Sequence, residues 1–198
     1  MIPTSLLGRR ILLRPLRADD FDQWRSVRQN NDQWLTQWEP SRPLYAPNVF
    51  ENRGAFAKRC QARDREWQMG IGYGFGLFLA GNFIGEINLS SVQRGPFQSC
   101  YVGYWVAKSC AGNGYVPESL AMVIRFAFEQ LQLHRIQVSV VPRNHASRRV
   151  AEKLQLRHEG IAERYLEING VWEDHIRFAM TVEEWELRKD EIISGWLS

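Results

Sequence analysis

The chain of 198 residues has few cysteines and histidines and no long hydrophobic run. Cys60, Cys100 and Cys110 form no C-x-x-C pair, and with four scattered histidines they predict neither a disulfide framework nor a metal site. No stretch reaches the roughly 18 apolar residues of a membrane span, and residues 1–10 lack the apolar core of a signal peptide. We therefore expect a cytoplasmic protein with no metal and no membrane partner.

The charge is nearly balanced, with 25 basic and 22 acidic residues and a net charge of +3. No basic cluster predicts a surface for duplex nucleic acid, so no nucleic-acid partner is expected. Hydrophobic residues make up 44% and aromatic residues 12%, which supplies a sizeable core and excludes a disordered chain. The length predicts a single domain over residues 1–198.

Hydrophobic periodicity predicts alternating strands and helices. Strands are expected at residues 9–14, 73–79, 83–92, 100–107, 135–141, 161–168 and 171–180. Helices are expected after Asp19 or Asp20, at 47–65, at 116–131, after Asn144 and after Thr181, where Glu184 completes a capping box. The order predicts a mixed α/β fold with a central sheet. Gly72, Gly74 and Gly76 leave one face of the 73–79 region nearly bare, which favours a closely packed helix above it.

A glycine turn, Ala111-Gly112-Asn113-Gly114-Tyr115, joins an aromatic strand to the helix that carries Glu118. Backbone N–H groups at such a junction face outward at the positive end of the helix dipole, which suits a phosphate or pyrophosphate. The turn matches neither a Walker A loop nor G-x-G-x-x-G. By itself this motif is a weak signal and is more often a simple turn than a ligand site.

Downstream, Asn144-His145-Ala146-Ser147 opens a second helix directly after the strand at 135–141. Strand, glycine turn, helix, strand and Asn-x-x-Ser together resemble the cofactor core of the GCN5-related N-acetyltransferases. The resemblance implies a mostly antiparallel sheet in which two parallel strands splay apart and hold the pantetheine arm of acetyl-CoA. It further implies that Gly112, Asn113, Gly114, Tyr115 and Val116 bind the pyrophosphate, and that Asn144 and Ser147 line the cofactor site.

Further motifs are similar to one branch of that family, the ribosomal-protein-alanine N-acetyltransferases of the RimJ type. They are Trp38-Glu39-Pro40, Val92 to Gly95, Tyr101 to Tyr104, Leu133 to Ile136, Tyr165 to Gly170, and Trp172 to His175. The likeness runs over nearly the whole chain. It implies direct transfer of an acetyl group, in a ternary complex, to the N-terminal alanine or serine of a ribosomal protein.

Three positions depart from the family pattern. Ala111 and Val116 stand at the ends of the phosphate turn, where a Gln or Arg and a small residue are usual, and Ala151 replaces the tyrosine that many relatives use as an acid toward the leaving thiolate. Ser147, one turn earlier, is the expected substitute. Backbone N–H groups near Trp105 and Val106 are expected to polarise the thioester carbonyl.

The acceptor amine must be neutral to attack the thioester. Free α-amines have a pKa of about 7.7–8.0 and lysines one of about 10.4, so a site without a strong base fits N-termini better. Glu86 is the first candidate for the base, against the alternative of a solvent-facing glutamate. Glu39 is the second, or it holds the acceptor's ammonium beside Trp38, which is either a peptide clamp or core.

Other titratable residues are interpreted as structural. Glu118 is expected to be a favourable charge at a helix start, and His134, His145 and His175 are expected at a helix end, on the surface and on a strand face. Two other functions stay open on the sequence. One is a small-molecule amine acetyltransferase acting on a polyamine, amino sugar or amino acid, and the other is a non-catalytic acyl-CoA-binding ribosome-assembly factor.

Overall fold

One mixed sheet organises the chain. The computed structural model describes residues 3–41 and 52–198, and within them eight strands follow the order β1-β2-β3-β4-β5-β6-β8-β7. The strands are β1 (Leu6–Leu7), β2 (Ile11–Arg14), β3 (Tyr73–Leu79), β4 (Asn82–Gln93), β5 (Ser99–Val106), β6 (Arg135–Val140), β7 (Arg157–Ile168) and β8 (Val171–Thr181). Only β5 and β6 pair in parallel. The predicted α/β class and the single parallel pair in a mostly antiparallel sheet are confirmed.

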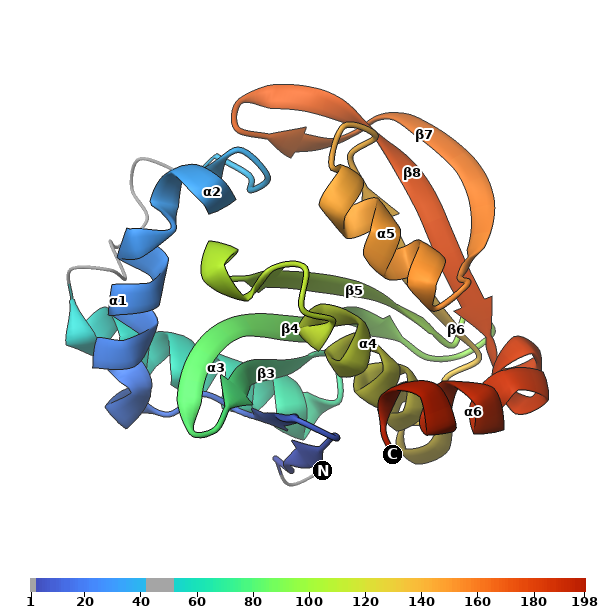
Figure 1. Ribbon diagram of the computed structural model, residues 1–198, viewed down its shortest axis with the longest axis horizontal. Helices are drawn as coiled ribbons and strands as arrows, with labels where there is room; N and C mark the ends of the chain where they lie inside the picture. Colours follow the sequence, from blue (N-terminus) through green and yellow to red (C-terminus); the bar gives the residue numbers. More distant parts are fainter. Residues whose placement is uncertain (1–2, 42–51) are drawn as a thin grey trace.

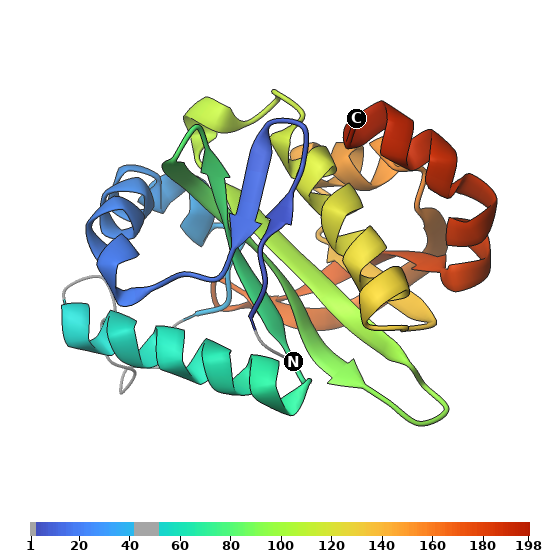
Figure 2. The ribbon, with the colours of Figure 1, turned by 90° about the horizontal axis from the view of Figure 1, so that it is seen from below.

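Helices cover both faces of this sheet (Figures 1 and 2). They are α1 (Phe21–Asn30), α2 (Asp32–Thr36), α3 (Arg53–Met69), α4 (Tyr115–Arg125), α5 (His145–Lys153) and α6 (Val182–Trp196). Single turns lie at η1 (Ala18–Asp20) and η2 (Lys108–Cys110), and α4 runs on into a π-helical turn, η3 (Phe126–Gln130). Figure 2 shows α3 below the sheet and α4 above it, with α6 beside α4.

Two apolar clusters fill the space between the sheet and the helices on its two faces. The larger lies between the sheet and α4, where Leu120, Val123 and Ile124 are fully buried, and it extends to Trp185 and Ile192 of α6. Burial of this α4 face follows from the hydrophobic stripe in its sequence. The smaller cluster packs α1 and α3 against the opposite face of the sheet.

The bare face of β3 is covered by a helix, as its glycines predict. A Cβ on Gly74 would lie 3.4 Å from the Arg63 side chain of α3, and one on Gly72 would lie 3.0 Å from the Glu66 carboxylate. Glycine therefore lets α3 approach the strand closely.

Helix boundaries follow local signals where a capping side chain is present. The Asn144 Oδ1 atom accepts a hydrogen bond from Ser147 N at 3.0 Å, and Thr181 with Glu184 forms the capping box of α6. Asp20 behaves differently from the prediction: its carboxylate does not cap α1 but pairs with Arg14 and accepts from Arg17 N. Burial acts to raise the pKa of Asp20, but the hydrogen bonds and charges of Arg14 and Arg17 together lower it.

Several elements differ from the sequence analysis. β1 and α2 were not predicted, because two and five residues are too short for a periodic signal. The strand expected from residue 161 begins four positions earlier, at Arg157. The expected helix at 47–65 is observed as α3, with Asn52 as its cap, and residues 47–51 lie outside the described part of the chain.

Candidate active site

The parallel strands β5 and β6 diverge soon after they meet. They pair only from Ser99 to Tyr101 on β5 and from Arg135 to Gln137 on β6. Beyond these residues β5 continues to Val106, while β6 continues to Val140 paired with β8 alone. The facing edges of β5 and β6 therefore separate and leave room between two strands of one sheet.

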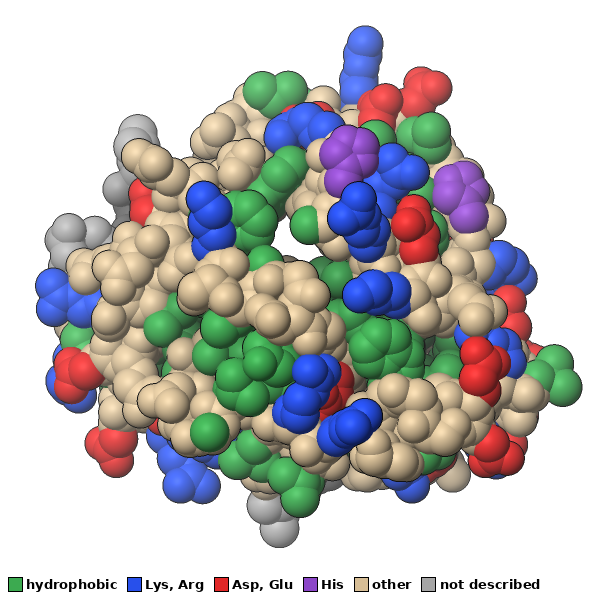
Figure 3. Space-filling model, viewed as in Figure 1, with side chains coloured by type: hydrophobic (Ala, Val, Ile, Leu, Met, Phe, Trp, Pro, Cys, Tyr) green, Lys and Arg blue, Asp and Glu red, His purple; other side chains and the backbone are tan. Residues whose placement is uncertain are grey.

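A cleft of about 590 Å³ occupies this divergence. Both faces of β5 line it, with Gly103 and Trp105 on one side and Tyr104 and Val106 on the other. Its further walls come from three segments of the chain: Trp34 to Pro40, Cys110 to Pro117, and Asn144 to Lys153 on α5. Figure 3 shows the opening of the cleft as a hollow near the centre of the view. The cleft thus joins the predicted glycine turn, the Asn-x-x-Ser segment and the tryptophan-rich segment.

The glycine turn presents the start of α4 to the cleft. Gly112 and Gly114 both have φ of 82°, a left-handed conformation that glycine adopts without strain. Gly114 is the N-cap residue and supplies no side-chain cap. The first N–H groups of α4 therefore remain available to an anion.

Arg10 brings a positive charge to the same turn, which the sequence analysis missed. Its Nη1 atom donates to the Asn113 carbonyl at 3.0 Å, and its guanidinium stacks on the Tyr115 ring at 4.8 Å. A Cβ on Gly114 would lie 3.3 Å from Arg10 Nη2. Ala111 cannot contribute a positive charge to the glycine turn, and Arg10 supplies one from the turn between β1 and β2.

Glu118 holds Arg10 in place, and this corrects its interpretation as a simple helix-start charge. Its side chain is fully buried, and its carboxylate accepts hydrogen bonds from Arg10 Nε at 2.8 Å, Arg10 N at 2.6 Å and Ile11 N at 2.9 Å. A buried carboxylate needs such partners to offset its desolvation. The sequence carries no sign of them, because Arg10 and Glu118 lie 108 positions apart.

Across the cleft, α5 and β5 bring two hydroxyl groups together. The Ser147 Oγ atom lies 3.0 Å from the Tyr104 Oη atom, which is also 3.3 Å from the Ser147 carbonyl oxygen. Burial raises the pKa of Tyr104 to about 12, against the smaller opposing effect of the Ser147 hydrogen bond. Tyr104 was not predicted as a site residue. The only signal was its place on the aromatic strand before the glycine turn.

Trp105 and Val106 direct their backbone groups to opposite sides of β5. The Trp105 carbonyl faces β4, where a Cβ on Gly85 would meet its oxygen at 2.2 Å. The Val106 carbonyl points away from β4 and accepts a hydrogen bond from Trp34 Nε1 at 3.1 Å. Because the N–H and C=O of one strand residue point the same way, the Val106 amide faces the open edge of β5.

The mouth of the cleft is formed by Trp38 and Glu39, which were predicted to bind the acceptor. Glu39 makes a two-point ion pair with Arg28, with distances of 2.5 and 2.7 Å. The Arg143 guanidinium stacks on the Trp38 ring at 4.6 Å. Both residues line the cleft, and each is held by an arginine from another element.

The tip of the β7–β8 hairpin meets this segment. Asn169 N donates to the Glu39 carbonyl at 2.8 Å, and the Glu167 carboxylate accepts from Ser41 Oγ at 2.9 Å. The Ser41 hydroxyl and the backbone N–H of Gly170 hold the pKa of Glu167 below its usual value. Figure 1 shows α2 and the hairpin converging above β5.

Glu86 lies outside the residues that line the cleft. One carboxylate oxygen accepts from Trp24 Nε1 at 2.7 Å and the other from Arg59 Nη2 at 2.5 Å. Each oxygen keeps a lone pair, but because Glu86 does not line the cleft, a proton released there has to reach it through water.

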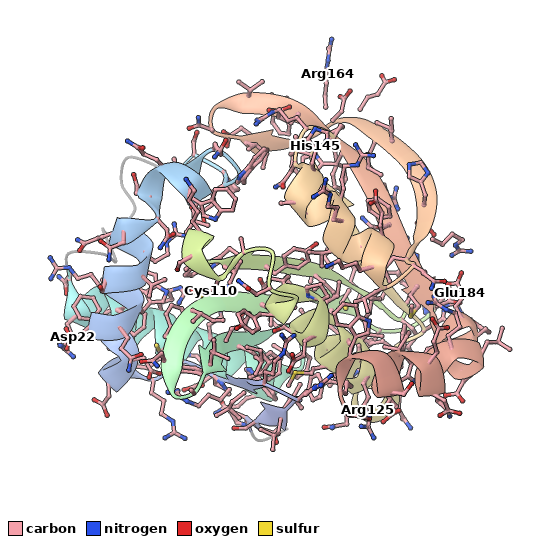
Figure 4. The ribbon with its side chains drawn as sticks, viewed as in Figure 1. Asp22, Cys110, Arg125, His145, Arg164 and Glu184 are labelled. Carbon is pink, nitrogen blue, oxygen red and sulfur yellow. The ribbon has the colours of Figure 1, made fainter. Side chains whose placement is uncertain are left out.

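The histidines stand apart from this chemistry. His134 is exposed and lies 3.1 Å from a Glu183 carboxylate oxygen, and His145 is exposed at the start of α5 (Figure 4). His175 is buried on β8, with Nδ1 3.0 Å from the Glu173 carbonyl oxygen. Figure 4 also places Cys110 in the segment that leads from β5 to α4.

Residues 3–41 and 52–198 offer neither a metal cluster nor a membrane-spanning helix. They contain no group of three or more His, Cys, Asp or Glu residues arranged to hold a metal ion. They also contain no helix long and apolar enough to cross a membrane.

Comparison with known proteins identifies the family. Residues 10–157 match the family described as "Acetyltransferase (GNAT) domain". The chain is 35% identical over 172 residues to the probable N-acetyltransferase YjcK of Bacillus subtilis (strain 168), covering 86% of this chain and 93% of that protein. It is 32% identical over 174 residues to the ribosomal protein uS5-alanine N-acetyltransferase of Escherichia coli (strain K12), covering 84% and 86%.

A solved structure agrees with these relatives. The fold matches that of Mycobacterium smegmatis RimJ in complex with CoA-disulfide with a TM-score of 0.87 and 31% identity, over 98% of this chain and 97% of that one. The chain therefore belongs to the GNAT acetyltransferase family. Within that family it is an acetyltransferase of the ribosomal-protein-alanine branch, as the motifs of its sequence predict.

Proposed function

We propose that this protein transfers the acetyl group of acetyl-CoA to the free α-amine of another protein whose first residue is alanine or serine. The observation that carries the proposal is the continuous cleft at the β5–β6 divergence. It joins an anion-binding helix start at one end to an aromatic mouth at the other. A cleft that both segments line lets a thioester and an amine meet in a ternary complex.

The cofactor half of the cleft suits a pantetheine carrier with phosphates. The turn from Gly112 to Val116 offers backbone N–H groups to the pyrophosphate, and Arg10 adds the charge that Ala111 lacks. Asn144 uses its Oδ1 atom in the helix cap, which leaves its amide nitrogen to donate to the pantetheine arm. The Val106 amide is assigned to the thioester carbonyl.

The chemistry requires little from a base. At neutral pH roughly a tenth or more of α-amines are already neutral, because their pKa is about 7.7–8.0. Glu86 acts on the amine only through water, since it does not line the cleft. Glu39 is paired with Arg28, and its carboxylate oxygens can still accept hydrogen bonds from the ammonium group of the acceptor. The Glu39–Arg28 pair as a whole carries little net charge. Ser147 gives a proton to the leaving thiolate.

The acceptor is proposed to be a ribosomal protein, which places the reaction in the cytoplasm. Support comes from the E. coli relative, which acts on ribosomal protein uS5. The Trp34 and Trp38 rings at the mouth fit the first residues of an extended peptide better than a polyamine, which would be attracted by unpaired carboxylates. Glu39, the carboxylate lining the described cleft, is already paired.

A peptide panel tests this function. Peptides starting with alanine or serine should release CoA thiol, at a rate that rises with pH and levels off near the α-amine pKa of about 8. The matched control is the same peptide with a blocked N-terminus and an internal lysine, which should be refused. Equal turnover of the blocked peptide, or turnover of polyamines alone, would refute the assignment.

A further inference from the structure

Ser147 is placed to act on the leaving thiolate, but a serine hydroxyl rotates freely and can point its proton in several directions. In the described chain, Ser147 Oγ has one hydrogen-bond partner, the Tyr104 hydroxyl at 3.0 Å. This partner comes from β5, on the other side of the cleft, and both residues line it. The direction of that hydrogen bond decides where the serine proton points.

Two features make Tyr104 the donor. A phenol, with an ordinary pKa near 10, is a stronger acid than a serine hydroxyl, so it is the better donor of the two. The Ser147 carbonyl oxygen can only accept and competes for the same proton, but at 3.3 Å from Tyr104 Oη it lies outside the usual O–H···O range, whereas Ser147 Oγ at 3.0 Å lies within it and receives the proton. The tyrosine proton is therefore directed at Ser147, and the serine proton is left for a group in the cleft.

We infer that Tyr104 is a positioning residue for the transfer reaction, which orients the Ser147 hydroxyl so that its proton faces the departing sulfur. The inference rests on the proposed function and extends it to a residue that does not itself exchange a proton. It explains how a serine can replace an acid on α5 although Ala151 stands where many relatives carry a tyrosine.

The step balances without a further reactant. The amine nitrogen attacks the thioester carbonyl carbon, the C–N bond forms and the C–S bond breaks. The Ser147 proton passes to the sulfur to give the free thiol. The proton lost by nitrogen returns to Ser147 Oγ through water. Tyr104 keeps its own proton throughout and stabilises the negative charge that develops on Ser147 Oγ. Its high pKa, near 12, agrees with a phenol that does not ionise.

Tyr104→Phe tests the inference, because it removes the hydroxyl and keeps the ring. General acid help is typically worth about 10²–10⁴-fold, and an oriented donor accounts for part of it, so kcat should fall about ten- to a hundredfold. The KM for acetyl-CoA and the affinity for CoA by calorimetry should stay within a few-fold. Tyr101→Phe is the matched control: its phenol, on the same strand, bonds to Tyr165 away from the cleft, and kcat should not change.

Two further measurements separate orientation from mere packing. Ser147→Ala should lose at least as much kcat as Tyr104→Phe, and the double variant should lose no more than Ser147→Ala, because Tyr104 acts only through the Ser147 hydroxyl. With S-acetyl-4-nitrothiophenol, whose thiolate leaves without a proton, the loss in each variant should shrink.

Several outcomes would overturn the inference: full kcat in Tyr104→Phe, an additive loss in the double variant, or an equal loss with both thioesters. Failure of the proposed function gives a different result. In that case the unmodified protein does not turn over N-terminal peptides at all, whereas failure of the inference alone leaves that turnover intact.

Discussion

Glu86 exemplifies a titratable residue whose partners determine what it can do. Its carboxylate bonds to Trp24 on α1 and Arg59 on α3, so it connects β4 to both helices. Its side chain is 14% exposed and that of Arg59 is 26% exposed. An ion pair with so little solvent around it depends on both partners, since removal of one leaves the other charge poorly compensated.

We predict that Glu86→Gln mainly lowers stability. Loss of the pair should cost about 1–3 kcal/mol, which lowers the melting temperature by several degrees in a chain of this size. The acetylation rate should fall tenfold or less, and the inflection of its pH profile should stay at the α-amine pKa. Thermal unfolding and initial rates between pH 6 and about 9.5 measure both effects.

Glu66→Gln provides the control for this prediction. Glu66 pairs with Arg63 on the same helix, but both side chains are about one-third exposed, so its removal should cost well under 1 kcal/mol. A rate loss in Glu86→Gln far above tenfold, together with a displaced inflection, would show instead that Glu86 takes the proton from the amine.

At the scale of elements, the turn between β1 and β2 and the start of α4 form one unit. Glu118 accepts from the backbone of Arg10 and Ile11 and from the Arg10 side chain, and Arg10 in turn bonds to Asn113. The β1–β2 turn thereby fixes the conformation of the glycine turn. A short N-terminal hairpin of little intrinsic stability is held by a buried carboxylate.

Arg10→Gln should weaken CoA binding about ten- to a hundredfold, because a hydrogen bond to a charged group contributes about 1.5–3 kcal/mol. Binding of S-acetylpantetheine, which carries no phosphate, should be unchanged. Calorimetry with both ligands makes the comparison, and Arg9→Gln, at an exposed neighbouring position, should match the unmodified protein. Equal weakening of both ligands in Arg10→Gln would mean that the start of α4 has moved and that Arg10 does not contact a phosphate.

At the scale of the whole molecule, three buried groups make stability depend on alkaline pH. Burial raises the pKa of Cys60 to about 11, and it raises the pKa of Cys100 and Tyr104 to about 12. In the unfolded chain the cysteines ionise near 8.5 and the tyrosine near 10. Above about pH 8.5 the unfolded chain therefore loses protons that the folded chain keeps, so the free energy of unfolding falls as pH rises.

Urea unfolding under reducing conditions at pH 7.5 and at about pH 10 should show this fall. Cys100→Ala should reduce the difference between the two pH values, because one of the three groups is gone. Cys110→Ala should leave it unchanged, since Cys110 is only partly buried. A free energy of unfolding that is the same at both pH values would contradict the assignment of buried, protonated thiols.

Local sequence patterns predicted most of the fold. Strand and helix positions follow from hydrophobic periodicity, the hairpin turn at Asn169-Gly170 from its dipeptide, and the starts of α5 and α6 from side chains within three residues of the helix end. The glycine turn and the Asn-x-x-Ser segment likewise stand out in the sequence, and both line the cleft. These features need only neighbours in the chain.

Local patterns of this kind were sufficient to predict the α/β class, the family and two walls of the cleft. Which side chains meet in the cleft depends on contacts between distant segments. Tyr104 and Ser147 are 43 positions apart, Arg10 and Glu118 are 108 apart, and Glu86 receives partners from 27 and 62 positions away. Hydrogen bonds of this kind form only after the sheet has brought distant segments together. No local pattern records them, because each residue is compatible by itself with a solvent-exposed position.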